Sequence, residues 1–240
     1  MNIFKLIKNK KNQDKNNHVA EAKPITIKKI EKIIEKRQAI SNDEFTKGYN
    51  LIKKYPRSVS VLGSARFKEG SEYYEKARSL TRKIASELGY AVVTGGGPGI
   101  MEAANRGAYE VGGVSLGFNI ILPKEQVENP YLTEHVDFEY FFSRKTLLFF
   151  SAESYVYFPG GFGTLDEFFE IVTLIQTNKI PSVPVILVGK KFWEPVLGLI
   201  KEKLWEEFDT IDEKDTNIYK IVDDENEILE IIRKAPFRQE

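Results

Sequence analysis

From residue 58 onward, short apolar runs alternate with amphipathic segments of helical spacing, and this alternation restricts the chain to few architectures. The apolar runs predict strands at 58–65, 91–97, 113–120, 136–142, 154–161 and 183–189. Helices are expected between and after them, at 73–89, 98–107, 144–152, 164–177, about 192–207 and 217–233. The pattern predicts an α/β fold, a Rossmann-like doubly wound parallel sheet flanked by helices.

The residues before this alternation have a different texture. Residues 1–24 are rich in lysine and asparagine, which indicates a basic flexible tail; contact with a membrane surface or RNA is the alternative to a solvated tail. In residues 25–56, Ile27, Ile30 and Ile34 recur at helical spacing. We expect an N-terminal extension of two short helices there, broken near Ser41, with the Rossmann-like domain at 57–240.

Composition argues against several function classes. The chain has no cysteine and two histidines, so disulfides, cysteine-based zinc sites and a Ser-His-Asp triad are not expected. The formal net charge is zero, so no global basic field attracts nucleic acid. No apolar run approaches the roughly 20 residues of a membrane span. The N-terminus lacks the apolar core of a signal peptide. We therefore expect a cytoplasmic protein with neither membrane nor nucleic acid as partner.

Two glycine-rich turns follow predicted strands, GGGPG at 95–99 and PGGFG at 159–163. Ligands of doubly wound sheets bind outside the carboxyl ends of the strands. Glycines let a ligand approach the backbone, and a helix N-terminus offers free N–H groups, so both turns suit a phosphate. Neither spells a dinucleotide or P-loop fingerprint, and tight turns alone would also need glycine. The candidate phosphate-binding residues are Gly96, Gly97, Gly160, Gly161 and Gly163.

Thr164 and Glu167 have the T-x-x-E spacing of a capping box, in which each side chain would bond the backbone N–H of the other residue. The alternative is that Glu167 turns toward a ligand and leaves the N–H groups to a phosphate. The pattern alone leaves both open.

Two basic residues are predicted at a helix N-terminus, where the helix dipole disfavours positive charge. Ser143 looks like an N-cap, which would place Arg144 and Lys145 in the first turn, against the helix dipole. An anionic substrate at this helix end would compensate, and so would a local acid such as Glu139. Ser64 and Arg66, after the first strand, are further candidates for an anionic ligand, with a plain surface position as the alternative for Arg66.

These motifs together resemble the LOG family, named for the plant Lonely Guy cytokinin-activating enzymes. PGGFGTLDE matches P-G-G-x-G-T-x-x-E, and Arg144-Lys145 precede Glu167 by the spacing of that family. The segments GSAR, TGGGPGIMEAANRGA, LPKEQVENPY, FFSRK and LIQTNKI resemble its bacterial branch, over about residues 57–205.

The resemblance implies a nucleoside 5′-monophosphate phosphoribohydrolase, acting on AMP or N6-modified AMP without a metal or redox cofactor. Arg144 and Glu167 would be the catalytic pair. The other site residues implied by the resemblance are Gly161, Gly163 and Thr164 for the phosphate and Lys145, Glu125 and Thr173 for the rest of the substrate. A homodimer or higher oligomer is expected. A nucleotide-binding sensor on the same fold, without catalysis, is the alternative.

Overall fold

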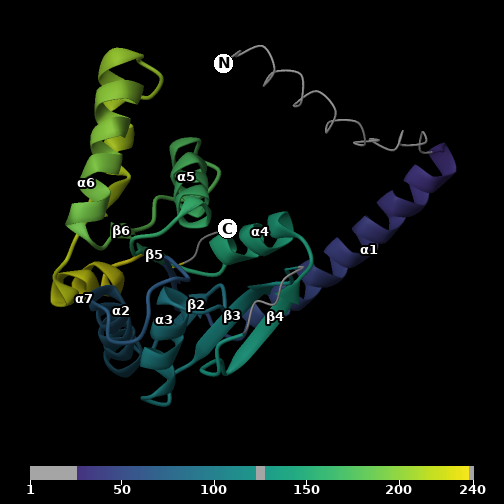
Figure 1. Ribbon diagram of the computed structural model, residues 1–240, viewed down its shortest axis with the longest axis horizontal. Helices are drawn as coiled ribbons and strands as arrows, with labels where there is room; N and C mark the ends of the chain where they lie inside the picture. The colour runs from purple at the N-terminus through teal and green to yellow at the C-terminus, as the bar shows by residue number, and fades with distance from the viewer. Residues whose placement is uncertain (1–25, 123–127, 238–240) are drawn as a thin grey trace, which may run out of the picture. The chain divides into compact units, whose positions relative to one another are not determined.

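The computed structural model describes residues 26–122 and 128–237 (Figure 1). The chain divides into two compact units, residues 1–38 and residues 39–240. The described residues of the first unit belong almost entirely to helix α1 (Ile27–Ile52), whose residues from Ala39 onward belong to the second unit. The tail predicted at 1–24 lies outside the described residues.

The predicted break near Ser41 is wrong, because α1 is one continuous helix. Its buried residues include Ser41, Glu44, Gly48 and Leu51, which recur at helical spacing from the supposed break onward. Burial of this face outweighs the weak helix propensity of Ser41 and the residues after it.

The second unit contains a parallel sheet of seven strands in the order β4-β3-β2-β1-β5-β6-β7. This confirms the doubly wound α/β fold. The strands are β1 (Ser58–Leu62), β2 (Ala91–Thr94), β3 (Ser115–Ile120), β4 (Glu134–Phe138), β5 (Ser154–Tyr157), β6 (Val185–Leu187) and β7 (Tyr219–Ile221). Strand β7 falls inside a segment predicted as helix, 217–233. Its three residues pair with β6 at the sheet edge, and so short a strand leaves little periodicity in the sequence.

Helices connect the strands and cover both faces of the sheet. They are α2 (Glu72–Lys83), α3 (Ile100–Tyr109), α4 (Phe141–Phe150), α5 (Phe162–Gln176), α6 (Lys190–Leu199) and α7 (Glu225–Arg233). Helices α2 and α6 continue into π-helical turns at Ile84–Leu88 and Ile200–Glu207, and a 3₁₀ turn spans Glu213–Asn217.

Two apolar cores separate the helices by face. Residues of α4, α5, α6 and the end of α1 pack on one face, and residues of α2, α3 and α7 pack on the other. Strand β5 shows the alternation: Tyr155 and Tyr157 enter the first core, and Val156 enters the second.

The strand order creates a topological switch point between β1 and β5. After β1 the chain moves outward through β2 and β3 to β4 at the edge, and α4 then returns it to β5 beside β1. Helix α4 therefore connects the edge strand β4 to β5, and its first residues follow the carboxyl end of β4.

Candidate active site

Three glycine-containing loops meet at the carboxyl end of the sheet. The backbone N–H of Ser64, after β1, donates to the carbonyl of Pro159, after β5, at 3.0 Å. The carbonyl of Ser64 accepts from Ile100 N, also at 3.0 Å, which joins the loop after β2 to the other two. Gly99 has φ +72° and room for no side chain, since a Cβ there would lie 2.4 Å from Ser64 O. The predicted glycine turns are thus neighbours in space.

Arg144 and Glu167 form an ion pair beside these loops. The guanidinium Nη1 lies 3.0 Å from Glu167 Oε1, and Arg144 Nε donates to the carbonyl of Phe118 at 2.8 Å. The side chains are 9% and 13% exposed. Arg144 comes from α4 and Glu167 from α5, so the fold joins two residues that the sequence holds 23 positions apart.

Gly95 makes room for the guanidinium. A Cβ at this position would lie 2.4 Å from Arg144 Nη2 and 2.8 Å from Met101 Sδ. Sequence reasoning named Gly96 and Gly97 as candidates and missed Gly95, although the run of three glycines contained the signal.

Burial and hydrogen bonding shift the pKa values of two groups in the site, Glu167 and Lys145. Burial raises the pKa of the Glu167 carboxyl, and the neighbouring Arg144 guanidinium opposes that rise without cancelling it. For Lys145, burial lowers the pKa, but hydrogen bonds to Glu170 and Asp166 outweigh it and leave the pKa raised. Its Nζ lies 2.5 Å from Glu170 Oε2 and 3.0 Å from Asp166 Oδ2. The site thus holds a carboxyl that keeps its proton to higher pH and a lysine that stays charged.

The N-cap predicted for the helix of Arg144, Ser143, is wrong. Helix α4 begins at Phe141 with Tyr140 as its N-cap, so Ser143 is a helical residue and Arg144 lies past the first three positions. Arg144 pairs with Glu167 and Lys145 with Asp166 and Glu170; the structure records no pairing of either with Glu139.

Helix α5 begins at Phe162, with Gly161 as its N-cap and no side-chain cap, so the capping box of Thr164 and Glu167 does not form. The local patterns failed because Glu167 finds a stronger partner, a buried guanidinium, on another helix.

The uncapped end of α5 opens on a hollow of about 550 Å³. Its lining residues are Ser64, Arg66, Phe67, Pro159, Gly160, Gly161, Phe162, Leu165 and Phe192. A Cβ added at Gly161 or Gly163 would meet nothing within 4 Å, whereas one at Gly160 would lie 2.1 Å from Thr164 Oγ1. Gly160 therefore serves the turn itself, while Gly161 and Gly163 leave backbone open beside the hollow.

The other predicted site residues take varied positions. Gly96, with φ +70°, packs against Asn119 and lines a second hollow, of about 240 Å³. The Gly97 carbonyl accepts from Asn129 Nδ2 at 3.1 Å. Thr173 is exposed on α5 and donates to the carbonyl of Phe169 at 2.7 Å. Glu125 lies outside the described residues. The binding roles of these residues stay predictions.

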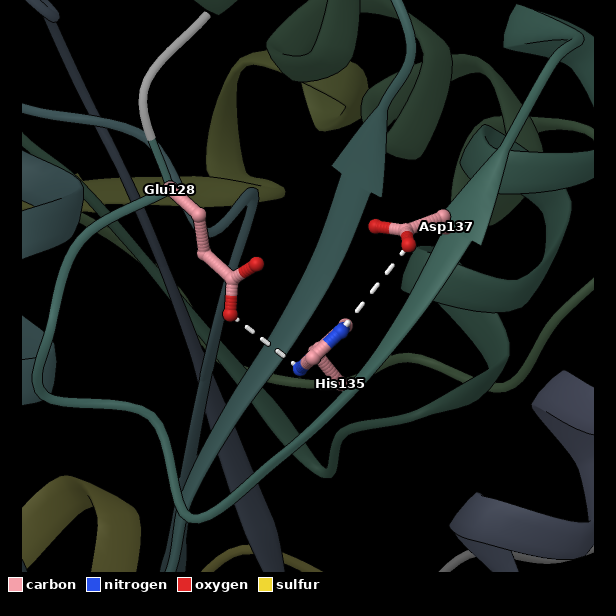
Figure 2. A group of neighbouring side chains, drawn as sticks. All are labelled: Glu128, His135 and Asp137. Carbon is pink, nitrogen blue, oxygen red and sulfur yellow. Dashed lines mark ion pairs between the residues drawn. The ribbon is translucent and has the colours of Figure 1, made fainter.

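One group of side chains in the described residues has the atom types of a metal site. Figure 2 shows His135 between Glu128 and Asp137, with Nδ1 3.1 Å from Glu128 Oε1 and Nε2 3.9 Å from Asp137 Oδ2. All three residues are exposed, and Asp137 also accepts from Asn119 Nδ2 at 3.1 Å. Exposed groups of this kind are common without a metal ion, so the arrangement alone assigns no metal site.

The fold and these side chains define a Rossmann-type α/β protein with a buried arginine–carboxylate pair at the carboxyl end of its sheet. A family model described as "Possible lysine decarboxylase" matches residues 101–232. The chain belongs to this family, the LOG family.

The chain is similar in sequence to known proteins of this family. The chain is 28% identical over 160 residues to the cytokinin riboside 5′-monophosphate phosphoribohydrolase of Rhodococcoides fascians, covering 65% of this chain and 79% of that protein. It is 28% identical over 159 residues to the rice (Oryza sativa subsp. japonica) enzyme of the same name, LOG, covering 65% and 64%.

Solved structures share the fold. A structural-genomics target aligns with a TM-score of 0.56 at 28% identity, covering 74% of this chain and 99% of that one. The molybdenum cofactor carrier protein of Chlamydomonas reinhardtii aligns with a TM-score of 0.55 at 21% identity, covering 75% and 97%. The latter likeness concerns the fold alone. Within the described residues, no helix has both the length and the apolar character that crossing a membrane requires.

Proposed function

We propose that this protein hydrolyses the N-glycosidic bond of nucleoside 5′-monophosphates, AMP or N6-modified AMP, and releases the free base and ribose 5-phosphate. The buried pair of Arg144 and Glu167 beside the glycine loops is the observation that carries the proposal. The names of the relatives in Rhodococcoides fascians and rice support the same reaction.

The substrate phosphate binds at the start of α5 in this proposal. The helix begins without a side-chain cap, so the N–H groups of its first turn and its positive dipole end face an anion. Gly161 and Gly163 admit the phosphate to the backbone, Thr164 adds a hydroxyl, and Arg66 lines the same hollow. Lys145 keeps its charge, which Asp166 and Glu170 neutralise in this structure.

Cleavage of an N-glycosidic bond develops positive charge on the sugar and negative charge on the departing base. Glu167 takes a proton from the water that attacks the anomeric carbon, while the bonding electron pair leaves with the base. Its raised pKa suits a general base better than an ordinary carboxylate, because the pKa lies nearer the working pH. Arg144 stabilises the negative charge on the departing base and orients the nucleotide.

The family is described as a possible lysine decarboxylase, but Lys145, the lysine of the site, does not suit Schiff-base chemistry. A lysine that forms a Schiff base needs a lowered pKa. Lys145 instead pairs with Asp166 and Glu170, and its pKa is raised.

Which nucleotide is the substrate is tested by incubating the protein with AMP, N6-isopentenyl-AMP, CMP and GMP. Chromatography then measures free base and ribose 5-phosphate. We expect both products from AMP or its N6-modified form. Binding of these nucleotides without turnover would instead support the nucleotide-binding sensor.

We also propose that the protein is at least a dimer. Helices α4 and α5 lie side by side, joined by the ion pairs of Lys145. They expose five phenylalanine side chains, at Phe141, Phe142, Phe150, Phe162 and Phe169. Exposed apolar side chains on two adjacent helices suit a protein–protein interface, although Phe142 and Phe150 also contact Phe45 and Tyr49 of α1.

A further inference from the structure

A buried carboxylate outside the site meets the first turn of α4, the helix that carries Arg144. Glu44, on α1, is 4% exposed. It accepts hydrogen bonds from the backbone N–H of Glu139 and from the hydroxyl of Ser143, residues that lie 95 and 99 positions later in the chain. Ser143 is fully buried and directly precedes Arg144.

Helix α4 has no acidic residue of its own at its N-terminus, and Glu44 supplies one. Its N-cap, Tyr140, makes no side-chain cap bond, and its first turn contains no acidic residue. Glu44 bonds the N–H of Glu139, which lies just before the N-cap, and the hydroxyl of Ser143 in the first turn. A carboxylate at this end of a helix also complements the positive end of the dipole. Burying a charge is costly unless it is well bonded, and these two donors with the helix dipole provide that bonding. The pKa of nearby Lys47 is raised, mainly by its hydrogen bond to Asp43 and to a smaller extent by the charge of Glu44.

The contact extends along both helices. Gly48, one turn after Glu44, lies so close to Leu147 that a Cβ would stand 2.3 Å from its Cδ1. The rings of Phe45 and Phe142 have centroids 6.3 Å apart, and those of Tyr49 and Phe150 lie 5.4 Å apart edge to face. Successive contacts advance in the same direction along α1 and α4, so α1 fixes the placement of α4 at several points.

We infer that Glu44 is a positioning residue of the site: it holds the first turn of α4 so that Arg144 meets Glu167. The inference rests on the proposed function for its catalytic consequence. Its structural basis is independent of substrate, because the chain of contacts runs from Glu44 through Ser143 to Arg144, Gly95 and Glu167. The N-terminal extension, which carries none of the family motifs, thereby acts on the catalytic pair.

The first test compares turnover in the full-length protein. Glu44→Gln keeps the shape of the side chain and removes its charge. We expect kcat for AMP to fall about tenfold, with KM within about threefold, since a small misplacement of a catalytic group lowers the rate of the chemical step. Ser143→Ala removes the partner from the other helix and should act in the same direction. Asp43→Asn, one residue away and 60% exposed, loses the same charge and should behave as wild type.

A second test needs no turnover. The ¹³C carboxyl signal of Glu167, assigned from its loss in Glu167→Gln, is titrated in wild type and in both variants of the contact. The charged and titratable groups around Glu167 are Arg144 and Lys145 of α4, Asp166 of α5 and Tyr157 of β5. Arg144 lowers the pKa of Glu167, so its displacement should raise that pKa above the wild-type value in Glu44→Gln and Ser143→Ala.

The outcomes separate the two proposals. Wild-type protein inactive on every nucleotide would refute the proposed function, while the titration would still decide the role of Glu44. Folded Glu44→Gln and Ser143→Ala variants with a wild-type Glu167 pKa would overturn the inference. A lowered melting temperature with unchanged kcat and unchanged Glu167 pKa would also overturn it, because Glu44 would then be structural only.

Discussion

The Glu167 carboxyl gives the site a specific pH dependence. Burial raises its pKa in the folded protein, and Arg144 only partly opposes this. An acid with a higher pKa in the folded state binds its proton more tightly there. The folded state therefore loses stability as pH rises from the unfolded pKa, about 4.3 for glutamate, through the folded pKa. Glu167→Gln removes this titration.

We expect wild type to lose free energy of unfolding relative to Glu167→Gln as the pH rises through that window. Urea unfolding of both proteins, at about one-unit steps from pH 4 to 7, measures the difference. Glu194→Gln, an exposed residue of α6, serves as the matched control and should show no such trend. A difference between wild type and Glu167→Gln that is constant with pH would refute the assigned shift.

Gly95 allows a second prediction, on activity. Its φ is not in the left-handed region, so alanine fits the backbone, but the added Cβ would lie 2.4 Å from Arg144 Nη2. Gly95→Ala should displace the guanidinium and lower kcat/KM about tenfold or more. Gly198→Ala, in α6 with nothing within 4 Å of the new Cβ, should keep wild-type kinetics and gain about 0.5–1 kcal/mol of stability. A wild-type kcat/KM in Gly95→Ala would contradict the prediction, because it would show that displacing the Arg144 guanidinium does not affect catalysis.

Between elements, the close contact of α1 with α4 predicts an effect on stability. Alanine normally stabilises a helix interior relative to glycine, but at Gly48 the new Cβ would press on Leu147, which is fully buried. Gly48→Ala should therefore lower the free energy of unfolding by about 1–3 kcal/mol, the usual cost of overpacking. Urea unfolding measures it, with Gly198→Ala again as control. A gain in stability would mean that the two helices can separate without cost.

The spacing of apolar residues and the positions of glycines were sufficient to predict most helices and strands, because buried parallel strands and amphipathic helices have strong hydrophobic patterns. Element ends were predicted poorly. The T-x-x-E pattern at Thr164 and the serine at 143 both looked like caps, yet Glu167 and Ser143 bond to residues of other helices. Cap residues are short-range signals, and a buried partner distant in the chain overrides them.

For the whole molecule, sequence reasoning named Arg144, Lys145 and Glu167, and the fold brings them together across α4 and α5. Arg144 and Lys145 stood out because cations oppose a helix N-terminus, and Glu167 because the family motif contains it. Glu44 gave no such signal: an acid within a lysine-rich helix looks solvated until tertiary packing buries it. The spacing of apolar and polar residues describes only local structure, so it does not predict a contact between segments about a hundred residues apart.

The exposed aromatic side chains of α4 and α5 make the assembly testable. Phe141 and Phe169 are 55% and 41% exposed, and burying the exposed part of each side chain at an interface contributes on the order of 1 kcal/mol. Light scattering should give at least twice the chain mass of 27.5 kDa for wild type. The double variant Phe141→Ser/Phe169→Ser should shift toward the monomer, while Phe208→Ser, at a 63% exposed position outside both helices, should not. A monomeric wild type at about 100 µM, or equal dissociation of the Phe208→Ser control, would exclude this surface as the interface.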